Sequence, residues 1–121
     1  MKSTWKDHER RIAQRLGGER IAVSDRRSST DVLHPLLSVE CKHRKSLPRL
    51  LHDAMGQARA AHPEKIGTII LHELNKNSDD DYVCVRLVDF EKLIESYQDM
   101  EYLRTTKPDM YEQAFSPHQS G

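Results

Sequence analysis

The sequence has few cysteines, no long apolar run and no net charge. Cys41 and Cys84 both lie in apolar runs, and no pair of cysteines has the spacing of zinc ligands. We therefore expect two buried thiols in a reducing compartment, rather than a disulfide or a structural zinc site. No run approaches the ~20 apolar residues that span a bilayer, and residues 1–7 lack the apolar stretch of a secretory signal. These absences predict a cytoplasmic protein without membrane contact.

The zero net charge hides a difference between the two halves of the chain. Residues 1–50 carry 12 Lys+Arg against 6 Asp+Glu, a net charge of +6. Residues 51–121 carry 7 Lys+Arg against 13 Asp+Glu, a net charge of −6. Such asymmetry favours an anionic partner on one face. A salt-bridged surface of a monomer or an oligomer explains the charges equally well.

Helical and strand patterns alternate along the chain. The apolar periodicity predicts helices over 4–16, over 47–62 and from about 90 to 96 or further. Short apolar runs predict strands over 20–24, 31–33, 36–42, 68–72 and 82–88. This order predicts a single α/β (α+β) domain over residues 1–106, with a mixed central β-sheet of about five strands flanked by helices. Residues 107–121 are polar and proline-containing, and we expect them to form a C-terminal tail or a dimer arm.

The segment Ser38-Val39-Glu40-Cys41-Lys42 places a carboxylate and an ammonium two residues apart in an apolar run. In a strand, Glu40 and Lys42 would project from one face while their neighbours face the core. A turn at His34-Pro35 could bring Asp31 beside them. Asp31, Glu40 and the Cys41 carbonyl are oxygen donors of the kind that Mg²⁺ or Mn²⁺ prefers, and Lys42 could orient a water or stabilise phosphorane charge. The alternative is an ordinary surface ion pair.

Two polar residues on predicted helices could join this group. Glu9 falls on the apolar stripe of the first helix, so it is either paired or functional; a partly exposed stripe edge is an equal alternative. Gln57 could point its amide into the site or occupy the solvated border of the second helix. Basic side chains flank the motif on both sides: Arg10, Arg26, Arg27, His43, Arg44 and Lys45. Each arginine taken alone is better explained as a solvated surface charge, but the cluster favours a groove that contacts a phosphate backbone.

Taken together, Glu9-Arg10, Ser28-Ser29-Thr30-Asp31, Val39-Glu40-Cys41-Lys42 and Gln57 resemble the PD-(D/E)xK nuclease superfamily. Within it, the pattern is most similar to the archaeal-type and phage Holliday junction resolvases. The resemblance implies a restriction-endonuclease-like domain and a Mg²⁺-dependent attack on DNA phosphodiesters. It assigns catalytic roles to Glu9, Asp31, Glu40, Lys42 and Gln57, with Glu9 as a direct or indirect metal ligand, and DNA contacts to Ser28 and Ser29. The sequence departs from the family pattern in two places. Thr30 stands where the pattern has proline, and the connection from Asp31 to Glu40 is tight.

The resulting expectation is a metal-dependent endonuclease that cuts branched DNA as a homodimer, because two symmetric cuts require two related sites. One alternative is a restriction, repair or nicking nuclease acting on linear duplex. Another is a nucleic-acid-binding module that has the fold without turnover. No helix-turn-helix or zinc finger is visible, so readout of base sequence is not expected.

Overall fold

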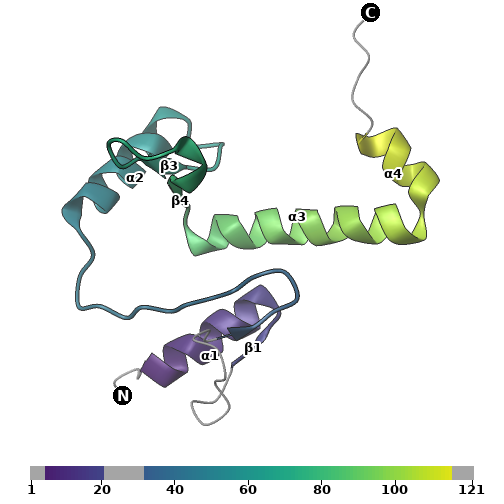
Figure 1. The fold of residues 1–121 in the computed structure, drawn as a ribbon, viewed down its shortest axis with the longest axis horizontal. Coiled ribbons are helices and arrows are strands. Elements are labelled where there is room, and N and C mark those ends of the chain that lie inside the picture. Colours follow the sequence, from purple (N-terminus) through teal and green to yellow (C-terminus); the bar gives the residue numbers. More distant parts are fainter. Residues whose placement is uncertain (1–4, 21–31, 116–121) are drawn as a thin grey trace, which may run out of the picture.

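The computed structural model describes residues 5–20 and 32–115. These residues form two parts joined by an extended connection (Figure 1). The N-terminal part, residues 5–42, contains α1, β1 and β2. The C-terminal part, residues 49–115, contains α2, β3, β4, α3 and α4. Residues 43–48 connect the two parts without helix or strand.

Helix α1 (Trp5–Leu16) presents one apolar face, on which Ala13 and Leu16 are buried. It ends where the sequence predicts, because Gly17 takes a φ of 75°, a left-handed conformation that glycine adopts without steric cost. The Gly18 N–H then donates to the Ala13 carbonyl at 2.8 Å. This contact satisfies one of the carbonyls that the end of a helix leaves open.

Two very short strands pack against α1. Strand β1 (Glu19–Arg20) pairs antiparallel with β2 (Val32–Leu33). Val32 also forms an isolated antiparallel bridge to Val39. With 1% of its surface exposed, Val32 is the most completely buried large side chain of the described residues. The small core of the N-terminal part is therefore centred on Val32 and the apolar face of α1.

A second helix and hairpin form a separate layer in the C-terminal part (Figure 1). Helix α2 (Arg49–Ala61) packs against β3 (Ile69–Leu71), which pairs antiparallel with β4 (Tyr82–Cys84). The chain between the strands includes the 3₁₀ turn η2 (Ser78–Asp80). Helix α2 has no buried residue, and Ile69 is the buried residue of the hairpin. This layer therefore has little core of its own.

Helix α3 (Leu87–Thr106) links the hairpin to α4 (Pro108–Phe115) and passes over α1 (Figure 1). Arg15 of α1 forms an ion pair with Glu91 of α3, which fixes the two helices against each other. Near the start of α3, Asp89 is buried and lies 3.3 Å from the Nε of Arg86.

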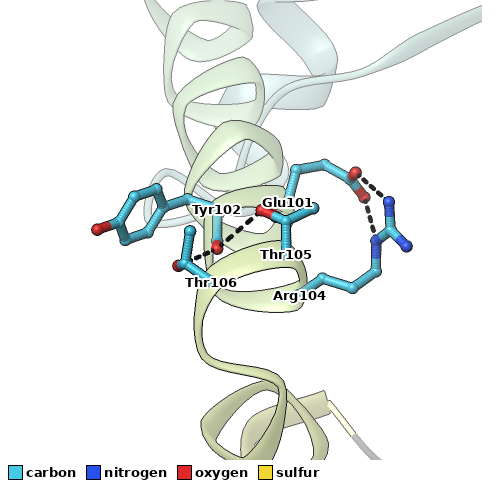
Figure 2. Close-up of polar contacts among 5 residues, drawn as sticks. All are labelled: Glu101, Tyr102, Arg104, Thr105 and Thr106. Atoms are coloured by element: carbon cyan, nitrogen blue, oxygen red, sulfur yellow. Dashed lines mark hydrogen bonds and ion pairs between the residues drawn. The ribbon is translucent and has the colours of Figure 1, made fainter.

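The end of α3 is stabilised by local polar contacts (Figure 2). The guanidinium of Arg104 donates to both carboxylate oxygens of Glu101, at 3.2 and 2.8 Å. This hydrogen bonding lowers the pKa of Glu101. The Thr105 hydroxyl donates to the Glu101 carbonyl at 2.9 Å, and the Thr106 hydroxyl donates to the Tyr102 carbonyl. In both contacts a threonine hydroxyl bonds to the carbonyl four residues earlier in its own helix.

The expected five-stranded central sheet is wrong. The described residues contain two separate two-stranded antiparallel sheets in a helix-rich chain. Residues 36–42 contribute the Val39 bridge rather than a strand, and the strand expected over 82–88 stops at Cys84 because α3 begins at Leu87. Short apolar runs fit a strand or a helix equally well, and the surroundings decide between them.

The helices agree better with their expected positions. The helices expected over 4–16 and 47–62 are α1 and α2. The third, expected from about 90 to 96 or further, is α3, which begins at Leu87 and continues to Thr106. Residues 108–115 of the expected tail form α4. None of the helices within the described ranges combines the length and the apolar composition required to cross a bilayer.

Candidate functional site

An open groove of about 690 Å³ brings together three parts of the chain. The groove is lined by α1, by residues 37–42, which carry the predicted motif, and by the end of the β-hairpin with the start of α3. The lining residues are His8, Ile12 and Leu16, residues 37–42, and Cys84, Val85, Leu87 and Phe90.

Glu40 and Lys42 lie together on this groove. The Lys42 Nζ lies 3.3 Å from the Glu40 Oε1, with 78% and 48% of the two side chains exposed. The expected buried strand around them is wrong, because residues 40–42 are outside any strand and both charged groups reach solvent. An exposed pair contributes little to stability, typically ~0–1 kcal/mol. Its two groups remain free to exchange their partner for a ligand.

Glu9 is buried, with 5% of its surface exposed, on the face of α1 that also carries Ala13 and Leu16. The structure therefore places this carboxylate on the apolar face of the first helix, as the sequence predicts. Its neighbour His8, rather than Glu9 itself, lines the groove. Within the part of the chain that the structure describes, Glu9 is therefore not one of the residues that line the groove.

The other predicted residues divide into those that lie elsewhere and those that the structure does not describe. Gln57 is exposed on α2, which packs against β3 and lies apart from the groove. Arg10 is exposed on α1 and lies 3.4 Å from Asp7. His43, Arg44 and Lys45 are exposed and follow directly after Lys42. The remaining predicted residues lie outside the described residues: Arg26, Arg27, Ser28, Ser29 and Asp31.

The described residues supply part of the oxygen set that a hard divalent cation requires. Glu40 offers an exposed carboxylate and Cys41, beside it, a backbone carbonyl. Within residues 5–20 and 32–115, no three His, Cys, Asp or Glu side chains gather closely enough to hold a metal ion. The donors present suit Mg²⁺, which keeps several waters and takes only one or two carboxylates. The resemblance assigns further carboxylates to Asp31, which lies outside the described residues, and to Glu9.

His8 is a groove residue that the sequence did not single out. Its Nδ1 is buried and has no hydrogen-bond partner among the residues that the structure describes. Its ring lies 5.4 Å from the ring of His43, centroid to centroid. His43 follows Lys42 directly, so this contact ties the basic connection to α1. The only signal in the sequence was the position of His8 beside the apolar stripe.

Both cysteines also line the groove. Cys41 and Cys84 are free, half-buried thiols. They come from different parts of the chain, so the groove is formed by packing the two parts together and exists in neither part alone.

A second cavity, of about 470 Å³, lies at the turn of the β-hairpin. Its lining includes Glu73 and the acidic run Asp79 to Asp81, with Lys76 as its cation. His72 lies beside this run, with Nδ1 2.6 Å from the Asp81 Oδ1. Carboxylates in this number repel phosphate. The groove at Glu40 and Lys42 is therefore the better candidate for a nucleic acid.

Comparison with known proteins adds no relative: the chain matches no protein family, no curated protein and no solved structure.

Proposed function

We propose that the protein is a Mg²⁺-dependent DNA endonuclease of the PD-(D/E)xK type, with its reactive groups at Glu40 and Lys42. The observation that carries the proposal is their pairing at 3.3 Å on the wall of an open groove. The resemblance of the sequence motif to this superfamily supplies the reaction class. Mn²⁺ is the expected substitute for Mg²⁺.

The two side chains have distinct roles in this proposal. Glu40 provides a carboxylate oxygen for a hydrated cation, with the Cys41 carbonyl and Asp31 as further donors. When bound, the cation neutralises charge on the scissile phosphate and lowers the pKa of a coordinated water. The Lys42 ammonium orients the attacking water and stabilises the negative charge that develops on the phosphate.

DNA binding is assigned to the basic connection that follows the motif. His43, Arg44 and Lys45 are all exposed and continue from the groove towards α2. Cations in such a row contact successive phosphates without reading bases. Affinity should therefore fall steeply with salt, with a slope that reflects the number of phosphates contacted.

A homodimer is part of the proposal because the C-terminal part exposes an apolar surface. Ile70 and Val83 are cross-strand partners in the hairpin, and both are exposed, at 58% and 63%. Paired residues share a face of the sheet, so their side chains form one patch. Exposed apolar side chains gathered on one face are the kind of surface that a second copy of the chain can cover.

A cleavage panel tests the proposal: four-way junction, flap, nicked duplex, linear duplex and single-stranded DNA, each with Mg²⁺, Mn²⁺ or EDTA. We expect metal-dependent cleavage with preference for the junction. Glu40→Gln and Lys42→Met should each lower kcat by at least about 100-fold without changing thermal stability, because both side chains are exposed.

The matched control is another exposed ion pair, Arg49 with Asp53 on α2, at 3.5 Å. Arg49→Met and Asp53→Asn should leave kcat unchanged. Full activity in Glu40→Gln or Lys42→Met would overturn the assignment of these residues. Equal cleavage of linear duplex and junction would favour the restriction, repair or nicking alternative. DNA binding with no cleavage under any metal would favour a non-catalytic binding module.

A further inference from the structure

The imidazole of His34 joins the end of α1 to the beginning of the motif segment. Its side chain is buried, with 9% exposed. Nε2 lies 2.8 Å from the carbonyl oxygen of Leu16, which is the last residue of α1. The backbone N–H groups of Leu36 and Leu37 point at Nδ1, at 3.1 and 3.2 Å.

These three contacts define one form of the ring. A carbonyl only accepts, so Nε2 must carry a proton and donate it to Leu16. A backbone N–H only donates, so Nδ1 must be unprotonated to accept from Leu36 and Leu37. The partners therefore specify the neutral Nε2–H tautomer. In this form, every polar atom of a buried ring has a partner.

The two ring nitrogens of His34 contact residues from different parts of the groove. Leu16 and Leu37 both line it, and Glu40 follows Leu37 by three residues. The intervening Val39 is fixed to Val32 by the isolated bridge. His34 and this bridge are therefore two of the contacts that position the Glu40 and Lys42 backbone relative to α1.

We propose that His34 is a positioning residue for the site: it holds the motif segment at the end of α1, and acts on the reaction only through Glu40 and Lys42. This inference rests on the proposed nuclease function, but the contacts of His34 do not. A displacement of reacting groups by about 1 Å can lower a rate by about 100-fold. Loss of one side of this connection should therefore affect kcat more than substrate binding.

Two substitutions separate the two sides of the ring. In His34→Asn, the side-chain oxygen can accept from Leu36 and Leu37, as in an Asx turn, but the side chain is too short to reach Leu16. In His34→Gln, the longer amide can donate towards Leu16, but the acceptor at the Nδ1 position is lost. We expect each variant to lower kcat by about 10-fold, with KM within about twofold of the wild type. The control is His52→Asn, a change at an exposed histidine of α2 that should leave kcat unchanged.

Two further measurements do not depend on cleavage. ¹⁵N NMR of the full chain should show the Nε2–H tautomer of His34. Hydrogen exchange at Val32 and Val39, the residues of the isolated bridge, should become about 10-fold faster in His34→Asn. An Nδ1–H tautomer, or wild-type exchange and wild-type kcat in both His34 variants, would overturn the positioning role. A wild-type protein that cuts no DNA would overturn the proposed function instead, and the tautomer and exchange results would then decide the role of His34.

Discussion

The two parts of the molecule bury and expose different chemistry. In the N-terminal part, Val32, Glu9 and His34 are all buried, so polar groups share a small core with apolar ones. In the C-terminal part, Ile69 and the ion-paired Asp89 are buried, while many large apolar side chains of β3, β4 and α3 reach the surface. The first arrangement fixes positions through specific contacts. The second leaves apolar area for another surface to cover.

The sharpest test of this comparison is a pair of valine substitutions. Val32→Ala removes a side chain that is 1% exposed, whereas Val83→Ala removes one that is 63% exposed. We expect Val32→Ala to lower the free energy of unfolding by about 2 kcal/mol, and Val83→Ala to change it by less than about 0.5 kcal/mol. Urea unfolding followed by circular dichroism measures both. Equal losses would show that the hairpin surface is as important to the monomer fold as the core around α1.

Association tests the apolar surface directly. The double change Ile70→Lys and Val83→Lys introduces two charges on the exposed face of the hairpin. We expect the dimer dissociation constant to rise at least about 10-fold, because the charges must be desolvated in the interface. Sedimentation velocity over a concentration series measures it. Met110→Lys on α4, an exposed apolar position elsewhere, is the control. An unchanged dissociation constant in the double variant would place the interface on another surface.

Glycine substitutions should have opposite signs in the two parts. Gly17→Ala forces a side chain into a φ of 75° at the end of α1, although no atom lies within 4 Å of the added Cβ. It should lower the free energy of unfolding by about 1 kcal/mol. Gly56→Ala within α2 also meets no atom within 4 Å, and should raise it by about 0.5–1 kcal/mol. Thermal unfolding of both variants measures whether each substitution raises or lowers the stability of the protein. Destabilisation by Gly56→Ala would mean that α2 packs more closely than the structure shows.

The smallest expected effect lies at the end of α3. The hydrogen bond from Arg104 lowers the pKa of Glu101 in the folded state. Its contribution to stability is therefore complete above the ordinary glutamate pKa, and is lost as the pH falls through the lowered value. Arg104→Gln should move the Glu101 pKa back up towards its ordinary range, with little change in overall stability because the pair is at the surface. An NMR titration of the Glu101 side chain measures the shift; an unchanged pKa would contradict the cause assigned to it.

The sequence predicted the helices well because their signals are local. The Gly17-Gly18 stop of α1 and Pro63 after α2 need no distant partner to act. The sheet was not predictable in this way. Whether Leu87 and Val88 continue a strand or start a helix depends on what packs against them, and the apolar pattern is the same in both cases.

The candidate site was predictable in part for the same reason. Glu40 and Lys42 are two residues apart, so their proximity follows from local geometry. The roles expected of Gln57 and Glu9 required long-range packing, and neither residue is among those described as lining the groove. The contact of His34 with Leu16 could not be inferred, because the sequence indicates a turn at His34 but not which residues pack against that turn.

The length of α3 has a practical consequence for attaching labels or fusion partners. Phe90, in its first turn, lines the groove, whereas α4 is at its far end. A helix of 20 residues extends about 30 Å. A fluorophore or surface anchor attached on α4 is therefore held about a helix length from the groove. One attached at Trp5 would be only three residues from His8, on the groove wall itself.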